Sequence, residues 1–106
     1  DLSVVRIETL GKIPTVAAFP HQIKALVHNS GSSNIPAGTQ VSLAISGANT
    51  FTNVKTTTAL APGAQQTITF DAVNAMVAGT NTVTVSVPAD DVTSNNTATF
   101  TQTVTN

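Results

Sequence analysis

Hydrophobic and polar side chains alternate along most of the chain. In residues 81–88, Val83, Val85 and Val87 occupy every second position, and hydroxyl side chains stand between them. The same period of two runs through the last strand-like stretch, where Gln102 is the one polar residue on an otherwise apolar face. Because successive side chains of a β-strand point to opposite faces, this period predicts half-buried strands.

We expect seven strands from this pattern. They cover residues 2–8, 22–28, 39–46, 52–58, 65–70, 81–88 and 97–104. Stretches rich in Gly, Pro, Ser and Asn, such as residues 29–38 and 61–63, separate them, and these residue types favour turns. The stretch 52–58 is weakly apolar and carries Lys55, which is typical of a strand at a sheet edge.

Two stretches do not fit the alternation. Residues 11–20 are irregular and rich in proline, and we expect them to cross from one sheet to another. Residues 70–79 are more apolar, and we expect a short turn of helix there with Asp71 as its N-cap.

Short antiparallel strands joined by turns predict an all-β fold, an Ig-like seven-stranded antiparallel β-sandwich in a single domain of residues 1–106. The cysteine pair and tryptophan of antibody domains are absent. The inward-facing positions form the expected core. They are Leu2, Val4, Ile23, Val27, Val41, Leu43, Ile45, Ile68, Phe70, Val83, Val85, Val87 and Phe100. An odd number of strands places the two chain ends at opposite poles.

The composition narrows the range of functions. Only 8% of the residues are charged and the net charge is -1, whereas a typical soluble domain has about 25% charged residues. This surface has no basic footprint for nucleic acid. The absence of cysteine excludes disulfides, thiol catalysis and Cys-based zinc sites. No apolar run approaches the ~20 residues of a membrane-spanning helix, so we expect no membrane insertion. The chain opens directly on a strand-like stretch, so we expect a mature protein or a module excised from a larger secreted protein.

The stretch that precedes the last strand concentrates oxygen donors. Asp90, Asp91, Asn95 and Asn96 offer carboxylate and amide oxygens of the kind that calcium binds. The alternative is a polar turn in which these side chains bond nearby backbone groups. The D-x-D-x-D spacing of a calcium loop is absent, which favours the turn. Asn95 also begins an N-x-[ST] pattern, for which we expect a structural role.

No residue constellation indicates catalysis. His21 and His28 are seven residues apart, so a regular strand would place them on opposite faces. The chain has no G-x-S-x-G elbow, no obvious carboxylate pair and no phosphate-binding glycine loop. We therefore expect no enzyme activity and no cofactor, apart from the calcium alternative.

Sugar binding is the main alternative function. Sugar-binding sites use exposed aromatic rings as stacking platforms, and the chain has neither Trp nor Tyr. Phe70 and Phe100 stand on apolar strand faces and are expected in the core. Phe51 is the phenylalanine that we expect to be available for ligand binding.

Several turn and strand motifs occur together in a recognisable order. The chain opens on Asp-Leu, continues with "HNSG" after the second expected strand and with "LAPGAQQTITF", and then has "GTNTVTVSV" followed by "NN". This order resembles the CARDB domain, the cell-adhesion-related domain of bacterial and archaeal surface proteins. The matching residues are Asp1, Leu2, Asn29, Gly31, Leu60, Gly63, Thr67, Phe70, Gly79, Val83, Val85, Val87, Asn95 and Asn96. Thr93 and Ser94 depart from the acidic residues that relatives often carry before "NN".

The resemblance implies an extracellular or cell-surface Ig-like sandwich of a bacterial protein, used for spacing or adhesion. Together with the composition, it predicts a non-catalytic structural module that spaces or docks neighbouring domains, whose partners are domains of the same chain or cell-surface proteins. The alternative is a carbohydrate-binding accessory module of a secreted enzyme, with a glycan as partner.

Overall fold

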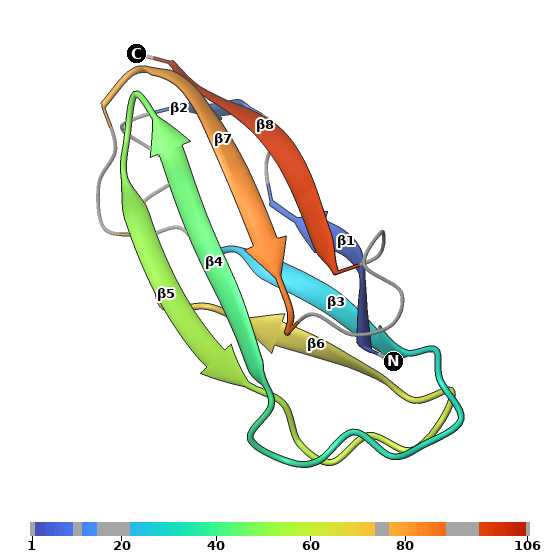
Figure 1. Cartoon of the computed structure of the whole chain (residues 1–106). Helices are drawn as coiled ribbons and strands as arrows, with labels where there is room; N and C mark the ends of the chain where they lie inside the picture. The colour runs from blue at the N-terminus through green and yellow to red at the C-terminus, as the bar shows by residue number, and fades with distance from the viewer. Residues whose placement is uncertain (1, 10–11, 15–21, 74–76, 89–95, 106) are drawn as a thin grey trace.

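The computed structural model describes residues 2–9, 12–14, 22–73, 77–88 and 96–105. Within these ranges the chain forms eight β-strands and no helix (Figure 1). The strands are β1 (Leu2–Glu8), β2 (Lys12–Pro14), β3 (Lys24–Asn29), β4 (Gln40–Gly47), β5 (Phe51–Thr56), β6 (Gln65–Thr69), β7 (Gly79–Ser86) and β8 (Thr97–Thr105). In the described residues there is accordingly no helix that could span a membrane.

The strands form two sheets. The three-stranded sheet has the order β1-β3-β6, and the five-stranded sheet has the order β2-β8-β7-β4-β5. The seven expected strands are all present and all antiparallel to their neighbours among these seven, with ends that differ from the predicted ones by no more than two residues. The predicted all-β sandwich is therefore confirmed, and β5 is an edge strand as expected.

The sequence pattern missed β2, which pairs in parallel with the end of β8. This strand has three residues, one of which is Pro14, so it is too short to show an alternating pattern. Residues 11–20 were predicted to cross once between the sheets. Instead β2 lies within this range and belongs to the five-stranded sheet, whereas β1 and β3 belong to the other, so the chain changes sheets before β2 and again after it.

The core lies between the two sheets and consists of aliphatic side chains around one phenylalanine. Every predicted core residue is buried except Phe100, which is half-buried and packs against the others. Ala25, Leu60, Val73 and Val104 complete the set. Gln102 also points inward and is fully buried, and its Nε2 donates to Oγ1 of Thr9 at 2.9 Å.

The described parts of residues 70–79 contain no helix, and residues 74–76 lie outside the described ranges. Asp71 does not cap a helix within the described chain. Its carboxylate instead accepts hydrogen bonds from Asn53 and Lys55 of β5. The apolar character of this stretch is explained by Phe70 and Val73, which are both buried in the core.

The molecule is elongated, with principal extents of 46 × 22 × 17 Å. As Figure 1 shows, β1 begins at one end of the long axis and β8 finishes at the other. We call these the N-terminal end, which carries the loops 30–39 and 57–64, and the C-terminal end, which carries residues 48–50 and 77–78.

Candidate functional site

The outer face of the five-stranded sheet is covered with uncharged, mostly hydroxyl-bearing side chains along β4, β5, β7 and β8. Strand register places Ser42 beside Ser86 and Thr82 beside Thr101. The outward-facing residues of these four strands are Gln40, Ser42, Ala44, Ser46, Thr52, Val54, Thr56, Thr80, Thr82, Thr84, Ser86, Thr97, Thr99, Thr101, Thr103 and Thr105. A face of this chemistry can form hydrogen bonds to neutral polar groups, and it has no charge with which to select ions.

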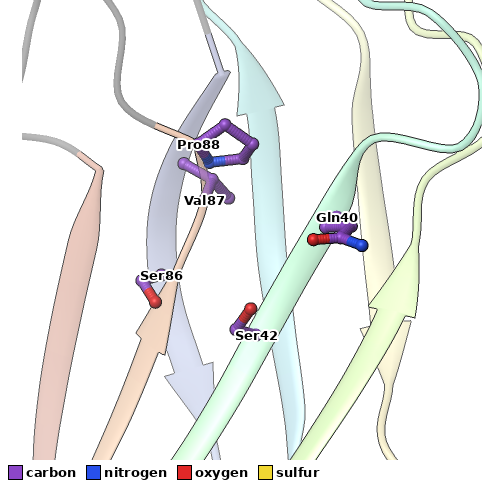
Figure 2. A pocket seen from close by; sticks show the side chains of 5 residues that line it. All are labelled: Gln40, Ser42, Ser86, Val87 and Pro88. Carbon is purple, nitrogen blue, oxygen red and sulfur yellow. The ribbon is translucent and has the colours of Figure 1, made fainter.

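A hollow of about 260 Å³ lies on this face towards the N-terminal end. Gln40 and Ser42 of β4 and Ser86 of β7 line it, together with Val87 and Pro88, which follow β7 (Figure 2). The lining therefore combines one amide, two hydroxyls and a small apolar wall. It contains no titratable side chain, so it can bind a neutral polar group but cannot supply an acid or a base.

A buried asparagine fastens the N-terminal end. Asn29 is fully buried, and its Nδ2 donates to the carbonyl oxygens of Ser33 at 2.8 Å and of Leu60 at 2.9 Å. Its Oδ1 accepts a hydrogen bond from the backbone N–H of Gly31 at 3.1 Å. One side chain thus holds its own loop in shape and ties that loop to the next one.

The two loops of this end also pair through their backbones. Ile35 and Leu60 exchange two hydrogen bonds of 2.8 and 2.9 Å, and Gly38 donates to the carbonyl oxygen of Thr57 at 2.9 Å. The loops consequently run side by side at the N-terminal end in Figure 1. These three bonds tie the two loops to each other.

A second buried asparagine fastens the C-terminal end. Oδ1 of Asn81 accepts hydrogen bonds from the backbone N–H and the Nδ2 of Asn49, at 3.0 and 3.1 Å. Asn49 in turn exchanges two hydrogen bonds with the backbone of Val77. Gly47 allows this close approach, because a Cβ atom there would lie 2.5 Å from the carbonyl oxygen of Thr80.

Polar side chains bridge one open seam between the sheets, where β5 approaches β6. Asp71 accepts hydrogen bonds from Lys55 Nζ at 2.6 Å and from Asn53 Nδ2 at 2.9 Å, and its backbone N–H donates to Asn53 Oδ1. The Lys55 ammonium, followed by the Asn53 amide, holds the pKa of the Asp71 carboxyl below its usual value. Farther along the seam, Gln66 Oε1 accepts two hydrogen bonds from Thr58. These contacts are those of a structural bridge on the surface.

Three of the four residues predicted for a calcium loop, Asp90, Asp91 and Asn95, lie outside the described residues. Asn96 is described and is buried, with 6% of its surface exposed. Its backbone oxygen accepts a hydrogen bond from Val87, whereas its side-chain Oδ1 is buried without a hydrogen-bond partner in the described chain. The described residues contain no group of three or more side chains that could hold a metal ion.

Phe51, the predicted ligand-binding residue, begins β5 and is half-buried. Its ring packs against the core, and Ile45 is its partner on β4. Its role in ligand binding stays a prediction. His28 lies half-buried on β3, on the opposite face from the buried Val27. His21 lies outside the described residues, so the predicted placement of the two histidines on opposite faces stays a prediction.

Sequence reasoning did not find the hollow or the two buried asparagines. Alternation places Ser42 and Ser86 on outward faces, but it does not reveal that β4 and β7 are neighbours or that these residues are partners. Asn29 and Asn81 occupy apolar-facing positions of their strands, and that is the one signal that could have marked them as buried amides.

Comparison with known proteins agrees with this fold. The sequence profile of the CARDB family matches residues 1–97. The CARDB domain of a Pyrococcus furiosus protein, solved in complex with di-metal ions, is 22% identical and superimposes with a TM-score of 0.78, covering 99% of this chain and 88% of that one. A search of curated proteins found no match. The chain therefore belongs to the CARDB family.

Proposed function

We propose that this CARDB domain is a non-catalytic structural module that spaces or docks the domains on either side of it. The observation that carries the proposal is the elongated sandwich whose two ends lie 46 Å apart at most, each fastened by a buried asparagine. A neighbouring domain attached at each end would be held at a fixed separation. The mechanism is passive, because a packed core transmits position without changing shape.

We further propose that the parent protein is secreted or displayed on a bacterial cell surface. The support is the low charge and the hydroxyl-rich outer face, which suit contacts with neighbouring domains or cell-surface proteins rather than with nucleic acid. Adhesive contacts would use the same face.

Fluorescent reporter domains fused to both ends test the spacing role. Single-molecule energy transfer would then measure the distribution of reporter distances. The width of this distribution decides the outcome, and its mean does not. A flexible chain with the same number of residues has an r.m.s. span of about 57 Å, which is close to the module's own length. We expect a narrow distribution, and a width equal to that of a Gly/Ser linker of the same length would contradict the proposal.

The second candidate is a carbohydrate-binding accessory module of a secreted enzyme. The observation in its favour is the hollow, whose amide and hydroxyl lining matches the groups that recognise neutral sugars. On a glycan array this function would give saturable binding that Ser86→Val abolishes and that Ser46→Ala, on the same face outside the hollow, leaves intact. No binding at any concentration would remove this candidate.

Metal binding would stabilise the folded domain that serves as the spacer. The relative from Pyrococcus furiosus was solved with di-metal ions, and Asn96 here has a buried oxygen without a hydrogen-bond partner in the described chain. If Asp90 and Asp91 hold calcium beside it, a hundredfold excess of calcium over Kd raises the free energy of unfolding by about 2.7 kcal/mol through linkage, and the Tm rises with it. Asp90→Ala should abolish this increase and Asp71→Ala should preserve it. An identical Tm in calcium and in EDTA would contradict the proposal.

A further inference from the structure

The strands nearest the two chain ends are arranged so that tension slides them past one another. β1 pairs antiparallel with β3 over six residue pairs, and β2 pairs in parallel with the last three residues of β8. β1 begins at the N-terminal end, and β8 runs towards the C-terminal end (Figure 1). A pull on the two ends therefore acts along these strands.

The direction of a pull relative to the hydrogen bonds decides how much force a strand pair resists. Hydrogen bonds between antiparallel strands run perpendicular to the strands. Tension along the strands loads all the bonds of a pair at once, whereas tension that separates the strands from one end breaks them one at a time. Each bond contributes only about 1 kcal/mol to stability, so resistance to force comes from loading many bonds together.

We propose that this module bears tension between its two ends, with β1–β3 and β2–β8 as two clamps in series. This inference rests on the proposed function, because a spacer between a cell surface and its target is the element that would carry such a load. The proposal adds a mechanical role to a geometric one.

One side-chain hydrogen bond reinforces the first clamp, and another joins the regions of the two clamps. Oγ of Ser3 on β1 donates to the carbonyl oxygen of His28 on β3 at 3.1 Å. Nε2 of Gln102 on β8 donates to Oγ1 of Thr9 at 2.9 Å, at the point where the chain leaves β1 for the other sheet. The second bond is buried on the side of Gln102, where water cannot easily replace it. It links the two terminal regions directly, between the two clamps.

Single-molecule force spectroscopy in two pulling directions tests the proposal. The chain has no cysteine, so one introduced thiol gives a unique attachment point. In the first direction the handles are attached at the two termini. In the second they are attached at Thr80→Cys and at the C-terminus, which pulls β7 and β8 apart from one end, because Thr80 is the partner of Thr103.

We expect terminal pulling to require a several-fold higher unfolding force than pulling from position 80. Each terminal event should release roughly 300 Å of chain, since an extended residue spans about 3.4 Å. Equal forces in the two directions would overturn the proposal. That outcome would leave the spacing role intact, because the width of the reporter-distance distribution is measured without load.

A matched pair of core variants locates the barrier. Val4→Ala and Val41→Ala remove the same atoms from the core, the first from β1 and the second from β4. Forced unfolding is governed by the unfolding rate, which responds to contacts broken at the barrier. Val4→Ala should therefore lower the terminal unfolding force, and Val41→Ala should leave it near the wild-type value. Equal losses of terminal unfolding force in the two variants would contradict the proposal that the β1–β3 pair forms the barrier.

Discussion

At the scale of single residues, three amide side chains stand out, because Asn29, Asn81 and Gln102 are fully buried in a largely aliphatic core. A buried amide is costly unless it is hydrogen-bonded. Here Asn29 and Asn81 make bonds that fix the loops at the two ends, and Gln102 reaches the residue after β1. The ends of the module consequently owe their shape to a few amides.

Replacement of Asn29 by alanine should destabilise the whole domain. The change removes three side-chain hydrogen bonds and leaves the carbonyl oxygens of Ser33 and Leu60 without this donor. We expect a loss of about 2 to 4 kcal/mol in the free energy of unfolding, measured by urea denaturation. The exposed Asn34→Ala on the same loop is the control, and it should stay within about 0.5 kcal/mol of wild type. Equal free energies of unfolding in the two variants would contradict the stabilising role of the Asn29 hydrogen bonds.

The lowered pKa of Asp71, at the seam between the sheets, predicts a small dependence of stability on pH. Its folded-state pKa is lowered, so its stabilising effect is present above the unfolded pKa and is lost as the pH falls through the folded value. In Lys55→Met the pKa of Asp71 should rise towards its usual value, with Asn53 still lowering it in part. An NMR titration of the carboxyl carbon measures this. Arg6→Gln, far from the seam, should leave the pKa unchanged, and no shift in Lys55→Met would refute the bridge.

At the scale of strands and turns, alanine substitutions at two glycines allow the cost of backbone strain to be measured apart from the cost of a steric clash. Gly38 and Gly47 both have positive φ, at 87° and 108°. A Cβ atom at Gly38 would meet nothing within 4 Å, whereas one at Gly47 would meet the carbonyl oxygen of Thr80. Gly38→Ala should cost about 1 kcal/mol for the strained backbone alone. Gly47→Ala should cost a further 1 to 3 kcal/mol, roughly, for the clash. Equal losses of stability in the two variants, measured by thermal unfolding, would contradict the close approach of Gly47 to the Thr80 carbonyl oxygen.

The alternation of buried and exposed side chains along β7 predicts opposite effects of the same substitution on the two faces of the strand. Val85 is fully buried and Thr82 is exposed on the outer face of the same strand. Val85→Asp should prevent folding, because an unpaired buried charge costs several kcal/mol. Thr82→Asp should fold with a Tm close to that of wild type. Circular dichroism of the two variants checks the register, and a folded Val85→Asp would show that the faces are assigned wrongly.

Strand positions and most of the core were predictable from the sequence, because the period of two needs only local information. Val83, Val85 and Val87 show this most clearly. What could not be predicted depends on contacts between distant residues. The hollow needs the partnership of Ser42 with Ser86, and β2 needs β8 as its partner. Asp71 looked like a helix cap because its bonds to Asn53 and Lys55 come from a strand far away in the sequence.

At the scale of the whole molecule, the two ends are held apart by a single packed body. The long axis of 46 Å is more than twice either of the other two, which measure 22 and 17 Å. Both loop clusters are tied down by side chains of strands, so position at one end is transmitted to the other through the core. Spacing, docking and the bearing of tension all require this property.

The most direct test is a distance measurement across the module. Nitroxide labels at Ser32→Cys and Thr50→Cys would stand on exposed positions at the N-terminal and C-terminal ends, in a chain without other cysteines. Pulsed dipolar spectroscopy then reports the distribution of label distances. We expect one narrow peak, which Asn34→Ala leaves in place and Asn29→Ala broadens. A broad or multiple distribution in the wild-type chain would contradict the rigid spacer.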